Sequence, residues 1–173
     1  MTVGTKKKVS ATFYRTVNGT EPVREWLLRL SKRDRKFVGA DIKTVEFGWP
    51  IGMPVCRSMK DGLYEVRTRL DNGRKRWTMA NKNQYVGSSV DDLLKETGEL
   101  AEVNAVALKR VIAWKIEQKM NAEHLSKTKM AALMRTSRSA LDRLLDPTNT
   151  SVTLHTLDNA ARALGKSLRI ELA

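Results

Sequence analysis

Four polar residues stand at the start of a short amphipathic segment and carry the donors and acceptors that read base edges in duplex DNA. They are Ser137, Arg138, Ser139 and Asp142. Arginine pairs with guanine through two hydrogen bonds, aspartate accepts one from cytosine, and serine bonds several bases. Arg143, one helical turn farther on, is placed to reach a base or a phosphate. The spacing therefore predicts contact with the major groove.

Two short helices separated by almost no linker are expected to position these side chains. The first begins at the cap-type Ser126 and the second at the cap-type Ser137, and apolar residues follow each at helical spacing. Only Arg135 and Thr136 lie between the two helical patterns. So short a turn is typical of a helix-turn-helix, which presents its second helix to DNA.

Further candidates for DNA contact lie in the first helix and the turn. Lys127, Thr128 and Lys129 are expected to bind phosphates, because backbone N–H groups at a helix start add to the attraction. Thr136 completes the predicted DNA-binding set. Arg135 stands where many such motifs have glycine, so we expect either a different turn or a positive φ costing about 1 kcal/mol. The alternative is that all these residues are ordinary exposed side chains.

Composition favours a soluble, basic protein. The 173 residues include 32 Lys and Arg against 19 Asp and Glu, a formal net charge of +13, which favours a polyanionic partner. One cysteine, Cys56, excludes an internal disulfide framework, and two histidines cannot assemble a zinc-type cluster. No run of about 18 apolar residues is present. We therefore expect a cytoplasmic protein with no membrane partner, metal or cofactor.

The N-terminal part predicts an α+β fold. We expect a strand over 9–15, helices over 22–30 and 31–48, and strands over 55–59 and 63–70. Ser31 caps the second helix and Gly48 ends it. In the last strand, Tyr64 to Leu70 alternates apolar or small residues with Glu65, Arg67 and Arg69, so one face is packed and the other is basic.

No third strand is expected after the hairpin strands at 55–59 and 63–70. The turn Asp71-Asn72-Gly73 should start one, but the basic run 74–76 and the polar residues from Met79 do not follow a strand pattern. The sequence therefore predicts an incomplete sheet with two helices, and an edge open to pairing with another chain.

The local net charge changes sign along the chain. Residues 1–78 hold 18 of the basic and 8 of the acidic residues, whereas 79–102 hold two basic and five acidic residues. The acidic segment is either a solvated linker with a short helix at 89–97 or a segment that docks on the basic N-terminal part.

The C-terminal part predicts an all-α domain. A long helix is expected over 105–120, followed by the helix pair, which Pro147 ends. A last helix begins at Thr153 and ends at Gly165. Residues 167–172 form a short strand pattern that can pair with its copy in a dimer.

Four blocks in the N-terminal part resemble the HigB-like toxins of the RelE superfamily. They are residues 21–27 (EPVREWL), 41–43 (DIK), 47–54 (FGWPIGMP) and 62–67 (GLYEVR). The resemblance covers about residues 9–76. It implies a small endoribonuclease that cuts mRNA on the ribosome with basic side chains of its central sheet.

The resemblance also implies catalytic candidates on the two hairpin strands: Arg57, Lys60, Arg67 and Arg69. Cleavage at a ribose 2′-hydroxyl needs an acid, a base and charge stabilisation. Arg67 and Arg69 suit the charge, and Tyr64 has a proton to transfer. The family pattern continues beyond Gly73-Arg74 into two further strands and a basic tail, which we expect this chain to lack. The candidates would then be vestigial.

Residues 87–95 and 136–147, with Leu157 and Gly165-Lys166, resemble the HigA-type antitoxins, which carry a helix-turn-helix. The antitoxin-like half of the chain is expected to begin at Met79. We therefore predict three parts: a truncated toxin-like part at 1–78, an acidic linker or neutralising segment at 79–103, and a helix-turn-helix antitoxin domain at 104–173.

The leading hypothesis is an antitoxin-type DNA-binding autorepressor of a toxin–antitoxin operon, carrying an inactive toxin fragment. The chain would bind operator DNA as a homodimer. Its protein partner would be a cognate toxin or its own toxin-like part. The alternative is an enzyme, a ribosome-dependent mRNA interferase that acts on mRNA at the ribosome. A third reading makes residues 1–78 a passive module that binds the acidic segment.

Overall fold

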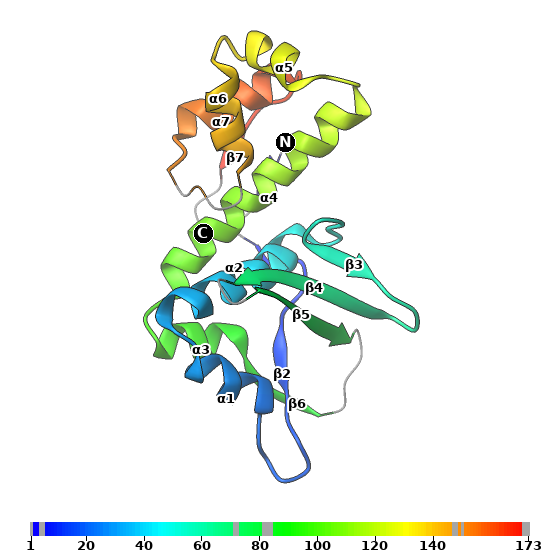
Figure 1. The fold of residues 1–173 in the computed structure, drawn as a ribbon, viewed down its shortest axis with the longest axis vertical. Coiled ribbons are helices and arrows are strands. Elements are labelled where there is room, and N and C mark those ends of the chain that lie inside the picture. Colours follow the sequence, from blue (N-terminus) through cyan, green and yellow to red (C-terminus); the bar gives the residue numbers. More distant parts are fainter. Residues whose placement is uncertain are drawn as a thin grey trace. The chain divides into compact units, whose positions relative to one another are not determined.

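The computed structural model describes residues 2–3, 6–70, 73–80, 85–146, 149 and 151–170, with the backbone alone at 2–3, 74–80 and 169–170. The chain forms two compact units. Lys7–Ala107, here called the mixed unit, combines helices with small sheets, and Leu108–Ala173 with Met1–Lys6, here called the helical unit, is mainly helical (Figure 1). A mixed α+β region followed by several helices is the fold class that the sequence predicted.

The mixed unit consists of β2 (Thr12–Tyr14), α1 (Pro22–Arg29), α2 (Lys32–Gly48), β3 (Cys56–Ser58), β4 (Leu63–Leu70), β5 (Gly73–Ala80), β6 (Val86–Ser89), α3 (Val90–Glu96) and the start of α4 (Leu100–Ala122). Strands β3, β4 and β5 form an antiparallel sheet, against which α2 packs. Strands β2 and β6 pair antiparallel in a separate ribbon.

The predicted helix starts in this unit are confirmed. Pro22 stands at the first position of α1, where its missing N–H costs nothing. The Ser31 hydroxyl accepts the Asp34 N–H at 3.1 Å and so caps α2, which ends at Gly48. These starts were predictable because a cap depends on residues within one turn of it.

The prediction of an unfinished sheet is wrong. Strand β5 pairs with β4 along its whole length, from Leu63 opposite Ala80 to Leu70 opposite Gly73. Strand preference depends strongly on neighbours, and eight residues of β4 supply a complete template for a basic, polar strand. The expected turn residues Asp71 and Asn72 lie outside the described part of the chain, whereas Gly73 has a φ of 113°.

The segment 79–103, expected as an acidic linker or a neutralising segment, supplies the last elements of the mixed unit. Val90, Leu93, Leu94 and Val103 are buried in one core with residues of β2, α1 and α2. Gly39 of α2 allows this packing, since a Cβ there would lie 3.2 Å from Leu94 Cδ2. The apolar residues of α3 thus share the core of the N-terminal part, and the two compact units meet between Ala107 and Leu108. The functional division at residues 78 and 103 stays a prediction.

The helical unit contains the rest of α4, α5 (Lys127–Leu133), α6 (Arg138–Leu145) and α7 (Leu154–Ala163). Its core is built from α4, α5, α6 and α7, with Ile116, Met130, Leu141 and Ala160 fully buried. The predicted caps Ser126, Ser137 and Thr153 are confirmed for α5, α6 and α7. Pro147, expected to end α6, lies outside the described residues.

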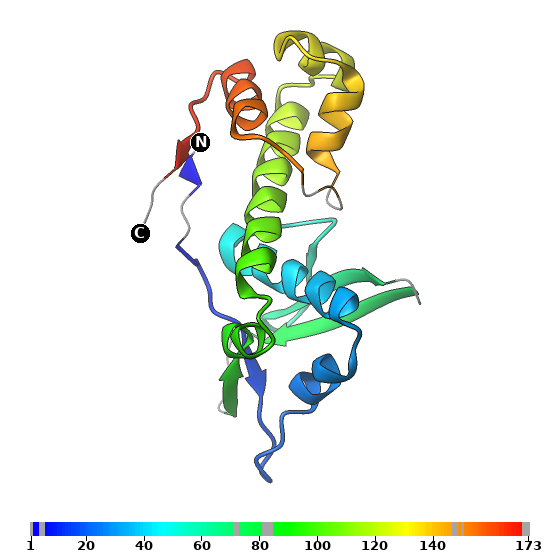
Figure 2. The ribbon, with the colours of Figure 1, turned by 90° about the vertical axis from the view of Figure 1, so that its left-hand side faces the viewer.

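The short C-terminal strand has a partner within the same chain. β7 (Arg169–Ile170) pairs in parallel with β1 (Thr2–Val3), as Figure 2 shows for the two ends of the chain. The sequence predicted a strand at 167–172 that pairs with its copy in a dimer. The pairing observed is instead with the N-terminal segment, which is why Met1–Lys6 belongs to the helical unit.

Among the helices that the structure describes, none has the length and hydrophobicity needed to cross a bilayer.

Arg135 bears the one backbone strain that the sequence anticipated. Its φ is 52°, in the left-handed region that disfavours residues with a Cβ. We expect Arg135→Gly to stabilise the helical unit by about 1 kcal/mol, measured by urea unfolding. The matched change Arg143→Gly, inside α6, should instead destabilise it by about 1 kcal/mol. Equal losses from both changes would contradict the assignment of strain to Arg135.

Candidate nucleic-acid interfaces

The β3–β4 hairpin of the mixed unit forms a basic cavity. It has a volume of about 480 Å³ and is lined by Arg57, Ser58, Met59, Lys60 and Glu65. The strand register sets Arg57 directly opposite Glu65. The cavity therefore brings two of the predicted catalytic candidates, Arg57 and Lys60, beside a carboxylate.

Glu65 is a functional candidate that the sequence prediction did not include. Only 8% of the residue is exposed, and its carboxylate pairs with the Arg67 guanidinium two residues along the same strand. A carboxylate next to cations can accept a proton while the cations stabilise a phosphate. Its signal in the sequence was one acidic residue at a position of the strand that otherwise carries arginine.

Tyr64 and Arg69 do not join this group in the same way. Tyr64 lies on the same face of β4 as Val66 and Thr68, which are buried. Its ring packs edge-on against the Trp49 ring, with the ring centroids 4.6 Å apart. Alternation along β4 puts it on the face opposite Arg67. Arg69 is exposed on the same face as Arg67. The five candidates are thus four basic residues around one hairpin and a tyrosine on its other face.

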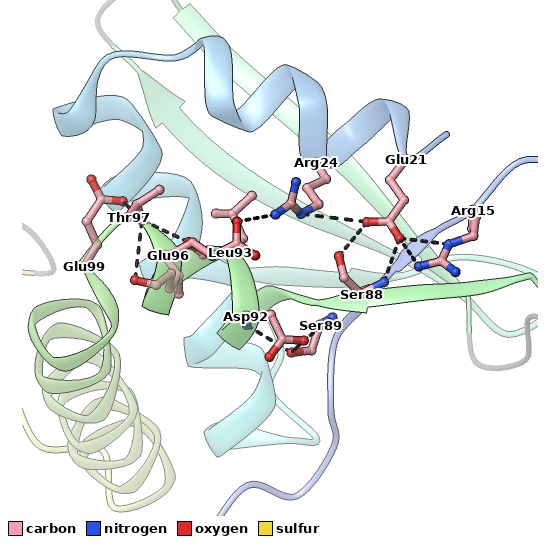
Figure 3. Close-up of polar contacts among 11 residues, drawn as sticks. Arg15, Glu21, Arg24, Ser88, Ser89, Asp92, Leu93, Glu96, Thr97 and Glu99 are labelled. Atoms are coloured by element: carbon pink, nitrogen blue, oxygen red, sulfur yellow. Dashed lines mark hydrogen bonds and ion pairs between the residues drawn. The ribbon is translucent and has the colours of Figure 1, made fainter. Parts of the chain in front are cut away.

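A second polar network joins β6 to the start of α1. Glu21 accepts hydrogen bonds from the Ser88 N–H at 2.8 Å, the Ser88 hydroxyl at 2.5 Å and Arg15 at 2.8 Å, as Figure 3 shows. Burial opposes ionisation of Glu21, but these hydrogen bonds outweigh it and lower its pKa to about 2. A Cβ at position 87 would lie 2.3 Å from Glu21 Oε1. Glycine at 87 is therefore what lets β6 approach so closely.

The acidic residues after β6 pair with basic residues of α1 and α2 and with Lys7, which precedes β2. The pairs are Arg24 with Glu96, Arg35 with Glu99, Lys36 with Glu102, and Lys43 and Lys7 with Asp91. Arg35 donates to both carboxylate oxygens of Glu99, at 2.8 and 3.0 Å, and the Glu99 side chain is fully buried. The segment expected to be a linker or a docking element is thus attached to the basic helices by charge as well as by apolar packing.

A comparison with protein families matches residues 25–86 to the model described as phage-derived protein Gp49-like (DUF891), a RelE/HigB-like toxin family. Residues 25–86 form a Gp49-like domain. The match runs from α1 through β5 to the first residue of β6, and so includes the strand that the sequence prediction left out. Neither the curated proteins nor the solved structures gave a match.

The Gp49-like domain shows no grouping of three or more metal-binding side chains in its described part, and neither does the rest of the described chain. Cys56, its cysteine, is buried in β3, and burial raises the pKa of its thiol. It lies in the strand that the sequence predicted over residues 55–59.

The helix pair α5–α6 in the helical unit contains the predicted DNA-binding residues. Four residues connect the helices, and both helix starts are capped: Ser126 accepts the Lys129 N–H at 3.2 Å and Ser137 accepts the Ala140 N–H at 3.1 Å. Most of the candidates are exposed: Lys127, Thr128, Lys129, Ser137, Arg138, Ser139 and Arg143, with Thr136 and Asp142 half-buried. The turn uses the positive φ at Arg135 that the sequence offered as one of two possibilities.

Two of these candidates contact each other. Lys127 Nζ of α5 donates to Asp142 Oδ1 of α6 at 2.6 Å, and Arg138 Nε lies 3.9 Å from the other carboxylate oxygen. The hydrogen bond from Lys127 is the main cause of a lowered Asp142 pKa. Asp142 is therefore ionised at neutral pH and holds one of the cations expected to bind phosphate.

We expect Glu99→Ala to destabilise the Gp49-like domain and its flanking elements by about 3 kcal/mol, because Arg35 is left nearly buried without its carboxylate. The matched control is Glu102→Ala, which removes a carboxylate that is 62% exposed from the next ion pair. It should cost less than about 1 kcal/mol. Thermal and urea unfolding of both variants measure the difference, and equal costs would contradict the role given to burial.

The same pair predicts a pH dependence. Burial alone would raise the Glu99 pKa, but the hydrogen bonds from Arg35 and Thr97 lower it below the ordinary value of 4.5. Its stabilising contribution is therefore present above about pH 4.5 and is lost as the pH falls through the lowered pKa. The stability gap between the wild type and Glu99→Gln should narrow on acidification and stay constant from pH 6 to 8.

Proposed function

We propose that the chain is a DNA-binding regulator of the toxin–antitoxin kind, in which α5 and α6 form a helix-turn-helix and the Gp49-like domain is its toxin-like part. The observation that supports DNA binding best is the helix pair itself: two capped helices, a four-residue connection, and exposed polar residues on the first turn of the second helix. This is the arrangement with which a recognition helix enters the major groove.

The residues of α6 have distinct proposed roles. Arg138, with 68% of its side chain exposed, suits a bidentate contact to guanine. Ser137 and Ser139 have hydroxyls for base or phosphate oxygens, and Arg143, one turn on, suits a phosphate. Helix-turn-helix proteins bind half-sites about one helical turn apart as dimers, so we also propose a homodimer on operator DNA.

The toxin-like part is proposed to be neutralised within the same chain. The support is the acidic segment from Asp91 to Glu102, whose side chains already pair with α1 and α2. A tethered segment binds at a high effective concentration, so its pairing does not depend on protein concentration. The regulator would then not be toxic, because its toxin-like part is already neutralised.

DNA binding is tested with the full chain and the DNA upstream of its own reading frame, against scrambled DNA, at two salt concentrations. We expect preference for the upstream DNA, and Arg138→Ala should weaken specific binding about tenfold. The control Arg162→Ala, on α7 and 74% exposed, should change it little. Equal binding to both DNAs, or monomers with and without DNA in sedimentation, would contradict the proposal.

A second candidate function is supported by the hairpin cavity. We propose as the alternative that the Gp49-like domain is an mRNA interferase, since β5 is present and Arg57, Lys60 and Glu65 share one cavity. In this reading Glu65 takes the proton from the attacking ribose 2′-hydroxyl, and the leaving 5′-oxygen takes a proton from water. Arg57, Lys60 and Arg67 stabilise the phosphate charge.

The alternative predicts growth arrest on expression of the chain. Arg67→Ala should abolish the arrest, and Arg29→Ala, an exposed residue at the end of α1, should not. Protein levels and thermal unfolding of both variants would exclude loss of the fold as the reason. Normal growth with the wild type, at matched protein levels, would leave the regulator as the function.

A further inference from the structure

The ion pair between Lys127 and Asp142 changes how the helix pair can bind DNA. Lys127 lies at the first position of α5, and Asp142 lies on α6 among the residues proposed to face base edges. Their side chains are 46% and 45% exposed and meet at 2.6 Å. An exposed ion pair adds little to the stability of the fold. It does change which partners its lysine can bind.

The pair makes Lys127 a weak phosphate ligand. A lysine that leaves water for a phosphate releases a counterion from DNA, which is the main source of nonspecific affinity. A lysine that must first leave a carboxylate exchanges one anion for another, and Asp142 then faces the phosphates unpaired. Lys129 and Arg143, which form no ion pair among the described residues, do not have this cost.

We propose that Asp142 is a specificity-determining residue that withholds Lys127 from the phosphates of nonspecific DNA. The inference rests on the proposed DNA-binding function and extends it. On nonspecific DNA the ion pair stays closed and one phosphate contact is lost. On the specific site Asp142 accepts a hydrogen bond from a base, such as the amino group of cytosine, and Lys127 becomes available to the backbone.

The proposal assigns Lys127 and Asp142 a joint role that neither has alone. Removing the carboxylate frees Lys127 on nonspecific DNA, so affinity for nonspecific DNA rises. Affinity for the operator does not rise with it, because Lys127 is already available there and the base contact of Asp142 is lost. Removing the lysine has little effect on nonspecific binding as long as Asp142 is present. A lysine that simply binds phosphate behaves differently, because it contributes to DNA affinity whether or not Asp142 is present.

The experiment measures binding of the full chain to operator and scrambled DNA between 50 and 200 mM salt, for the wild type, Asp142→Asn, Lys127→Met and the double variant. Asp142→Asn should steepen the salt slope on scrambled DNA by about one and raise that affinity about fivefold to tenfold at 0.1 M salt. The preference for operator DNA should fall about tenfold. Lys127→Met alone should leave the salt slope on scrambled DNA unchanged. In the double variant it should reverse the gain that Asp142→Asn brings on scrambled DNA.

The control is Glu123→Gln, which also removes one carboxylate from an exposed ion pair, with Lys119 on α4 at 2.7 Å. It should leave the preference for operator DNA unchanged and so excludes an effect of net charge. A salt slope on scrambled DNA that is reduced by about one in Lys127→Met alone would overturn the inference, as would equal gains on both DNAs in Asp142→Asn. Absence of any DNA binding by the wild type would overturn the proposed function as well.

Discussion

The buried charge of Lys43 is the constraint on which the mixed unit depends. Its side chain in α2 is fully buried, as is that of Glu46, with which it pairs. Asp91 of α3 accepts a second bond from Lys43 at 2.6 Å and a bond from Lys7 at 2.5 Å. Charges in a buried site are costly unless they are well paired, and Asp91 adds a second carboxylate beside Lys43 by bringing the residues after β5 back to α2. Glu46 also accepts the Ala11 N–H at 2.6 Å, which fixes the entry to β2 at the same point.

This return changes the meaning of the net charge. The +13 of the chain is concentrated in its first 78 residues, but several of those cations already have carboxylate partners on α3 and α4. Charge that is paired inside a unit does not attract a polyanion from a distance. For the proposed nucleic-acid partners, the cations of the hairpin and of α5–α6 are therefore more relevant than the net charge of the whole chain. The acidic segment also explains why the toxin-like part and the start of α4 form one compact unit.

The sequence predicted what depends on neighbouring residues and missed what depends on distant ones. The caps Ser31, Ser126, Ser137 and Thr153 were readable because each bonds an N–H within one turn. Strand β5 was missed because its residues have weak strand preference and are held by β4. Strand β6 was missed because it is polar, and it is positioned by Glu21, 67 residues before Ser88. A single sequence gives no direct signal for such a contact.

The sequence prediction of the candidate sites left out the acidic neighbours for a related reason. Each basic residue was considered alone, but Arg67 is paired with Glu65 and Lys127 with Asp142. In the reaction proposed for the hairpin, the carboxylate supplies a proton acceptor that the four cations lack. In the DNA binding proposed for the helix pair, the carboxylate competes with phosphate for the Lys127 ammonium. The acid therefore decides what its cation can do, and a list of basic residues on a surface describes a nucleic-acid site only when its acidic neighbours are included.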